Sequence, residues 1–103
     1  MSVYVVLSYE VFDQKRFAQY RAAAALLVPQ FNGKILASQA NPEHPDSGRG
    51  ISHMSLVEFD TVADMKAMTQ NAMTGSVMAL RISSAETRTH VLYGDSEKHA
   101  DLA

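Results

Sequence analysis

The sequence predicts an α+β fold of the ferredoxin-like type, with a four-stranded antiparallel sheet and its helices on one face. Two observations predict this class. Four short segments rich in β-branched and aromatic residues have the apolar and polar patterning of strands. Two further segments carry apolar residues at helical spacing, one after the first strand and one after the third. The resulting order, strand–helix–strand–strand–helix–strand, is that of the ferredoxin-like motif.

The first strand is expected over residues 3–12. One of its faces is continuously apolar and carries Val3, Val5, Leu7, Tyr9 and Val11. The other face is mixed and carries Tyr4, Val6, Ser8, Glu10 and Phe12. Because successive side chains of a strand point to opposite faces, one side of the sheet is expected to pack on the core and the other to meet a partly polar environment.

A helix is expected to follow, because Asp13 can accept hydrogen bonds from the free amides of a first turn. Its apolar stripe consists of Phe17, Tyr20, Ala24, Leu27, Val28 and Phe31. The alanines at 22–25 strongly favour a helix. Pro29 is expected to bend the helix or end it early. In the pair Asn32-Gly33, the glycine is expected to stop it in the left-handed conformation.

Two strands separated by a loop are expected next. Residues 34–40 form the second strand and residues 52–60 the third. The loop between them, at 41–50, contains two prolines and two glycines and is the only long one in the chain. No helical or strand pattern crosses it.

The second helix is expected to begin after Thr61, with Asp64 in a position typical of a capping box. Its apolar pattern is interrupted at 71–75 and resumes over 76–85. Residues 87–93 are expected to form the last strand.

The expected sheet has the strand order 4-1-3-2, with both helices on the same face. Its second face is then uncovered and exposes Tyr4 and Val6 together with their neighbours on adjacent strands. An exposed apolar sheet face of this kind usually marks an interface. We therefore expect a homodimer that forms through this face.

The length and composition are typical of one globular domain. The chain has 103 residues, of which 47% are hydrophobic and 19% charged. The domain is expected over residues 1–94, and residues 95–103 are expected to form a loose polar tail. A domain of this size has a modest core, which a partner would support.

Charge and residue usage exclude several function classes. Nine basic residues against eleven acidic ones, without a run of like charge, leave no expected partner surface for nucleic acid or an anionic membrane. The absence of cysteine excludes disulfides, thiol nucleophiles and iron–sulfur clusters. We find no secretory or membrane-spanning pattern, so a cytoplasmic protein is expected. Neither the histidines nor the glycines have the spacing of a metal or nucleotide site, so no cofactor is expected.

Several short segments, taken in order, resemble a known family. They are Tyr4-Val5-Val6 with Glu10 and Asp13, Tyr20-Arg21, Phe31-Asn32-Gly33-Lys34-Ile35-Leu36, Glu58-Phe59, Ala79-Leu80-Arg81, and Arg88 with Gly94. On these residues the chain resembles domain-of-unknown-function family 1330, within the dimeric α/β-barrel superfamily, over about residues 3–94. The resemblance implies the ferredoxin-like fold and a dimer with an eight-strand, barrel-like assembly. Relatives in this superfamily include cofactor-independent monooxygenases, haem-degrading enzymes, small cyclases and ligand-sensing domains.

Glu10 and Glu58 are candidates for acid/base chemistry, because they fall on strands that neighbour each other. If both lie on the uncovered face, they line the cavity of the dimer, where desolvation and mutual repulsion would raise the pKa of one of them. Such a carboxyl group can serve as a general base. The alternative is that the two glutamates form ion pairs with Arg81, Arg88 or Lys34 at the ends of the sheet.

Arg81, His90, Tyr4 and Ser8 complete the predicted site. Arg81 is expected to bind a carboxylate or enolate, because a guanidinium holds such groups in a bidentate fork; its alternative role is an ion pair within the protein. His90 is expected to act as an acid or base in the cavity. Tyr4 and Ser8 lie on the mixed face of the first strand and are expected to contact the ligand.

The sequence leaves three functions open. The leading hypothesis is a metal-free enzyme that acts by acid/base chemistry on a small, apolar, oxygenated metabolite in the barrel cavity. The first alternative is a ligand-binding or interaction module without turnover. The second alternative is a cofactor-independent monooxygenase, which needs an electron-rich substrate and no special residue.

Overall fold

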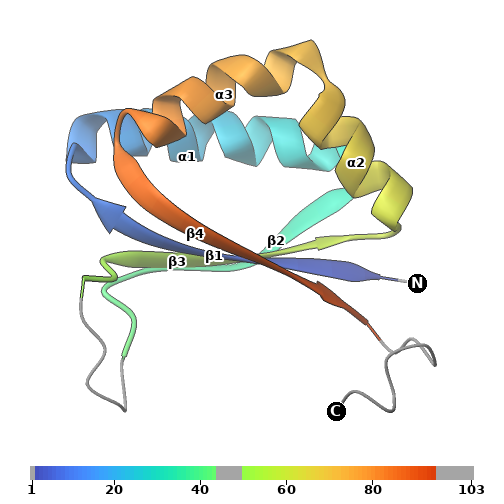
Figure 1. The fold of residues 1–103 in the computed structure, drawn as a ribbon, viewed down its shortest axis with the longest axis horizontal. Helices are drawn as coiled ribbons and strands as arrows, with labels where there is room; N and C mark the ends of the chain where they lie inside the picture. Colours follow the sequence, from blue (N-terminus) through green and yellow to red (C-terminus); the bar gives the residue numbers. More distant parts are fainter. Residues whose placement is uncertain (1, 44–49, 95–103) are drawn as a thin grey trace.

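The computed structural model describes residues 2–43 and 50–94, which form a four-stranded antiparallel sheet with its helices on one face (Figure 1). The elements are β1 (Val3–Val11), α1 (Gln14–Leu27), the 3-10 helix η1 (Val28–Phe31), β2 (Gly33–Ala40), β3 (His53–Phe59), α2 (Val62–Gln70), α3 (Ala72–Ile82) and β4 (Ala85–Tyr93). The strand order β2-β3-β1-β4 confirms the predicted order and fold class. The predicted tail at 95–103 and residues 44–49 of the predicted loop lie outside the described residues.

The helix α1 begins and ends as its sequence predicts. The Asp13 carboxylate accepts a hydrogen bond of 3.0 Å from the backbone amide of Arg16, so Asp13 is the N-cap. The α-helix ends at Leu27, and Pro29 lies in the 3-10 turn that follows. Pro29 therefore ends the regular helix early, because proline has no amide to donate. Over residues 2–43 and 50–94, no helix is long and apolar enough to cross a membrane.

The prediction for the end of this helical segment is wrong in one detail. Asn32, not Gly33, adopts the left-handed conformation, with φ 58° and ψ 32°. Asparagine tolerates this region better than most residues. Gly33 is required for space instead, because a Cβ atom there would lie 2.5 Å from Val28 Cγ1 and 2.8 Å from the Phe59 ring. The close approach of three elements, rather than a backbone dihedral, explains this glycine.

The second helical segment consists of two helices, where the sequence predicts one with an interrupted pattern. Thr61 caps α2 as predicted, since its hydroxyl accepts a hydrogen bond of 3.1 Å from the Asp64 amide. Asn71 then adopts an extended conformation with ψ 139°, which ends α2. Its side chain accepts a hydrogen bond of 2.8 Å from the Met73 amide and so caps α3. A single residue thus separates the two helices, and α3 begins earlier than residue 76.

The core lies between the helices and the sheet. The buried apolar residues are Val3, Leu7, Tyr9, Phe17, Tyr20, Leu27, Val28, Val57, Phe59, Val77 and Ala85. The residues of β1 in this set are odd-numbered, so the even-numbered ones point away from the helices. In the described part of the chain, no helix covers that second face of the sheet (Figure 1). The sheet therefore has one face under helices and one bare face.

Substitution of Gly33 tests the close approach of β2, η1 and β3. Gly33→Ala should lower the free energy of unfolding by about 1–3 kcal/mol, because the new methyl group overlaps Val28 and Phe59. Urea denaturation followed by circular dichroism measures this change. Gly75→Ala is the matched control, since no heavy atom lies within 4 Å of a Cβ added there. It should stabilise α3 by up to about 1 kcal/mol, and equal stability of the two variants would contradict the packing described.

Candidate functional site

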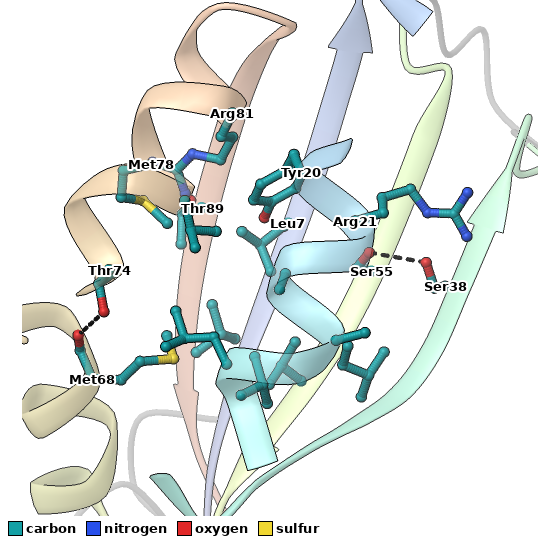
Figure 2. A pocket seen from close by; sticks show the side chains of 18 of the residues that line it. Leu7, Tyr20, Arg21, Ser38, Ser55, Met68, Thr74, Met78, Arg81 and Thr89 are labelled. Atoms are coloured by element: carbon teal, nitrogen blue, oxygen red, sulfur yellow. Dashed lines mark hydrogen bonds between the residues drawn. The ribbon is translucent and has the colours of Figure 1, made fainter. Parts of the chain in front are cut away.

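A cavity of about 700 Å³ lies between the helices and the helix-facing side of the sheet. Residues of α1, α2, α3 and all four strands line it, and Figure 2 shows many of their side chains. Its apolar wall includes Leu7, Val57, Phe59, Met65, Met68 and Met78. This volume and lining are those of a typical small-molecule pocket.

The cavity exists because α1 presents small side chains to it. Four alanines of this helix line the space, namely Ala18, Ala22, Ala24 and Ala25. Protein interiors are normally filled to high density by interlocking side chains, and a methyl group reaches only a short way from its helix. Three of these alanines, Ala18, Ala22 and Ala25, are solvent-exposed, so the cavity opens to solvent along their side of α1.

Polar side chains line the cavity on the side of α1 that faces α3, which we call the α3 side. They include Arg81 of α3, Tyr20 of α1 and Thr89 of β4 (Figure 2). Tyr9 of β1 also lines the cavity. The hydroxyl groups of Tyr9 and Tyr20 form a buried hydrogen bond of 2.8 Å. Arg81 Nε is buried and has no hydrogen-bond partner among the described residues. The α3 side thus holds an unused N–H donor.

Electrostatics keep the Tyr9 hydroxyl protonated. Burial raises the pKa of the Tyr9 phenol well above its ordinary value, and the adjacent Tyr20 raises it further. The positive charge of Arg81 acts in the opposite direction without reversing the shift. Tyr9 is therefore a hydroxyl group at neutral pH and not a phenolate base.

A second polar group lies on the other side of α1, which we call the β2 side. Arg21 of α1, Ser38 of β2 and Ser55 of β3 line the cavity there (Figure 2). The Ser38 hydroxyl is 2.8 Å from Nε2 of the buried His53 and 3.3 Å from the Ser55 hydroxyl. The His53 ring also makes an edge contact with the ring of Tyr9, at a centroid distance of 5.9 Å. Ser38 thus connects the cavity to a buried imidazole.

Both arginines place unneutralised charge at the cavity. Burial lowers the pKa of His53, and the charge of Arg21 lowers it further, so the imidazole is neutral at neutral pH. Within residues 2–43 and 50–94, neither Arg21 nor Arg81 forms a salt bridge. None of the described residues that line the cavity is aspartate or glutamate. The cavity therefore combines apolar walls with two cationic side chains.

Of the predicted site residues, Arg81 alone lines this cavity. Tyr4, Ser8, Glu58 and His90 lie on the bare face of the sheet together with Glu10. The strand register places Tyr4 between Glu58 of β3 and Leu92 of β4, so Tyr4 and Glu58 lie side by side on this face. The prediction that these five residues serve a ligand stays a prediction.

Glu10 and Glu58 share the bare face but are not neighbours. Glu58 is opposite Tyr4, whereas Glu10 is opposite Glu86. The six residue steps from position 4 to position 10 of β1 correspond to about 20 Å at 3.3 Å per step. The two carboxylates therefore do not form a pair within one chain, and their predicted mutual repulsion has no basis there.

The sequence reasoning missed Tyr9, Tyr20, Arg21 and the buried His53, because it assigned the ligand to the bare face. A signal was present in the strand pattern. His53 occupies a core-facing position of β3, where an apolar residue is the usual choice. A polar residue at such a position indicates either a local hydrogen-bond network or a polar pocket.

Comparisons with known proteins identify a family and a fold. The sequence model of the family described as a domain of unknown function (DUF1330) matches residues 2–95. A dimeric ferredoxin-like protein of unknown function from Jannaschia sp. CCS1 has a TM-score of 0.72 and 14% identity, covering 90% of this chain and 99% of that one. A protein of unknown function from Rhodopseudomonas palustris has a TM-score of 0.73 and 12% identity, with coverages of 88% and 80%.

SnoaB, a cofactor-independent oxygenase from Streptomyces nogalater, is similar as well. Its TM-score is 0.71 at 9% identity, and the match covers 92% of this chain and 94% of SnoaB. None of the curated proteins compared with the chain matches it. At such low identities the solved structures establish the fold alone, and the chemistry has to be argued from the cavity.

The lowered pKa of His53 predicts a pH dependence of stability. In the unfolded chain the imidazole titrates near its ordinary value of about 6.5, whereas in the fold its pKa is lower. The unfolded state therefore binds more protons between the two values, and stability is lost as the pH falls below about 6.5. The contribution of His53 to this slope is at most about 1.4 kcal/mol per pH unit.

Urea denaturation of the wild type and of His53→Gln at a series of pH values measures this contribution. The variant should lose stability less steeply as the pH falls. Ser38→Ala is the control, because it removes the hydroxyl next to His53 but keeps the buried imidazole. It should be less stable throughout and retain the slope. Identical slopes in the wild type and His53→Gln would refute the assignment.

Proposed function

The chain belongs to the DUF1330 family, a domain of unknown function, and from that premise we propose that it binds a small, largely apolar molecule with an acidic oxygen in the cavity beneath α1. The bound oxygen is an anion, either a carboxylate or a phenolate or enolate, and Arg81 stabilises it. The reaction that this arrangement favours is acid/base chemistry, because an enzyme that stabilises an enolate or phenolate lowers the cost of removing its proton.

The observation that carries the proposal is Arg81 Nε, a buried donor without a partner among the described residues, at a cavity with largely apolar walls. A buried polar group that makes no hydrogen bond is costly, so native proteins rarely retain one. A ligand oxygen at this position accepts the free N–H. It also neutralises a guanidinium that has no carboxylate partner among the described residues.

The two tyrosines support the same assignment. Tyr9 and Tyr20 are hydrogen-bonded to each other, and both line the cavity. A neutral hydroxyl donates to an anion more readily than to a neutral oxygen, because charge-assisted hydrogen bonds are the stronger ones. Apolar walls weaken dielectric screening, which increases the attraction between Arg81 and a bound anion.

Ionisation of a bound phenol tests the proposal. The wild type should bind 2-naphthol and lower its apparent pKa by about one unit relative to the free phenol, because Arg81 favours the naphtholate. Arg81→Gln should remove this shift, since the apolar walls then favour the neutral form. Absorbance titration of the bound phenol measures both values.

Arg16→Gln is the matched control for this measurement. Arg16 is on the same helix as Tyr20, but it forms a salt bridge of 3.8 Å with Asp13 and does not line the cavity. The control should behave like the wild type. Failure of the wild type to bind 2-naphthol, or an unchanged shift in Arg81→Gln, would overturn the proposal. Recovery of unaltered ligand after long incubation would assign binding without turnover.

Cofactor-independent oxygenation is a second candidate for the reaction. The observation in its favour is the same anion site, because an electron-rich phenolate held in an apolar cavity is a good reductant for O₂. The likeness in fold to SnoaB, itself a cofactor-independent oxygenase, adds support. Oxygen uptake in the 2-naphthol assay, lost in Arg81→Gln, would distinguish this reaction from proton transfer alone.

We further propose a homodimer that forms through the bare face of the sheet. Leu92 is 56% exposed on this face, and its partner in the register is Tyr4. Val6 and Leu56 are also paired there and are only partly buried. The similar protein from Jannaschia is described as dimeric.

Five predicted site residues lie between the two sheets of such a dimer, namely Tyr4, Ser8, Glu10, Glu58 and His90. A role of these residues in catalysis or ligand binding then depends on both subunits.

Light scattering tests the dimer. The wild type should have twice the chain mass of 11.3 kDa. Leu92→Asp should be a monomer, because it places a carboxylate in the apolar patch that Leu92 forms on this face. Leu26→Asp is the matched control, since Leu26 is 74% exposed on α1 and far from the bare face, and it should remain dimeric. A monomeric wild type, or a dimeric Leu92→Asp, would contradict this interface.

A further inference from the structure

We infer that the ligand of the cavity is an elongated dianion, with one acidic oxygen group at Arg81 and a second one at Arg21. This inference rests on the proposed function and adds a second charge and a minimum length to the ligand. Arg21 is then the residue that favours ligands with two acidic groups over ligands with one.

The two arginines lie at opposite ends of the space under α1. Figure 2 shows Arg81 with Thr89 on one side of this helix and Arg21 with Ser38 and Ser55 on the other. Thr89 is on β4 and Ser38 is on β2, which are the two edge strands of the sheet. Three strand spacings separate the edges, a distance of about 14 Å. A ligand that reaches both sides is therefore elongated.

Each guanidinium acts electrostatically on one of two neighbouring groups of the cavity floor, whose rings are in edge contact. Arg81 opposes the upward shift in the pKa of Tyr9, and Arg21 contributes to the downward shift in the pKa of His53. Neither arginine has a salt-bridge partner among the described residues. A ligand with one acidic group neutralises only one of these charges, whereas a dianion neutralises both.

The β2 side offers hydrogen-bond donors as well as charge. Ser38 hydrogen-bonds to His53 and Ser55, so the hydroxyl groups are held together at the cavity wall. Ser55 interacts with both Ser38 and Tyr9, so its hydroxyl group is held in place at the cavity wall. Between the two polar ends the wall is apolar, with Leu7 and Val57 among the residues of its floor. The arrangement fits an apolar body with an oxygen group at each end.

A matched pair of naphthalene acids tests the inference. Naphthalene-2,6-dicarboxylate carries its carboxylates at opposite ends of a rigid two-ring body, and 2-naphthoate carries only one. The wild type should bind the dicarboxylate about five-fold more tightly, since Arg21 is solvent-exposed and such ion pairs are modest. The preference should decrease as salt is added, because exposed charges are screened. Calorimetric titration measures both affinities.

Variants separate the two ends. Arg21→Gln should weaken the dicarboxylate more than 2-naphthoate and so abolish the preference, whereas Arg81→Gln should weaken both ligands. Arg16→Gln, which removes the same charge from another position of α1, should keep the preference. If 2-naphthoate binds but the dicarboxylate gains nothing, the inference is overturned and the proposed function stands. If neither acid binds to the wild type, the proposed function fails and the inference fails with it.

Discussion

The packing contacts that fix the two ends of α1 on the sheet determine where the cavity lies. At its N-terminal end, Phe17 and Tyr20 pack edge-on against Tyr9, with ring centroids 4.9 and 5.8 Å away. At the other end, Val28 packs closely against the backbone of Gly33. Because both ends are fixed by large side chains and close contacts, the alanines between them cannot move onto the sheet. The cavity is a direct consequence of this packing.

Local chemistry explains which parts of the fold could be predicted from the sequence. The alternation in β1 reports which of its faces is buried, and the caps at Asp13 and Thr61 depend only on amides three residues away. Gly33 was misinterpreted because its requirement comes from Phe59, 26 residues along the chain, as well as from nearby Val28. No local pattern contains that information.

The candidate site was harder to predict than the fold for a related reason. Strand alternation shows that a sheet has two faces, but it does not show on which face there is free space. The bare face carries Glu10, Glu58 and His90, and their titratable side chains are the reason that the sequence predicts the ligand site there. The free space lies beneath the alanines of α1, whose run was interpreted only as favouring a helix. Arg81 lines the cavity because α3 places it there, on the same layer as α1.

Polar groups buried between the helices and the sheet lower the free energy of unfolding unless they are hydrogen-bonded. The buried His53 is hydrogen-bonded to the hydroxyl group of Ser38, so its burial costs little. Arg81 Nε and Thr87 Oγ1 are buried without partners in the described structure, and such groups cost about 1–3 kcal/mol each when unpaired. An apolar side chain of similar size would avoid the cost at Arg81. A molecule that offers an acceptor to Arg81 recovers it and stabilises the folded state by mass action. Arg81 thus destabilises the empty fold and stabilises the complex with a ligand. A packing defect has the cost without the gain on binding.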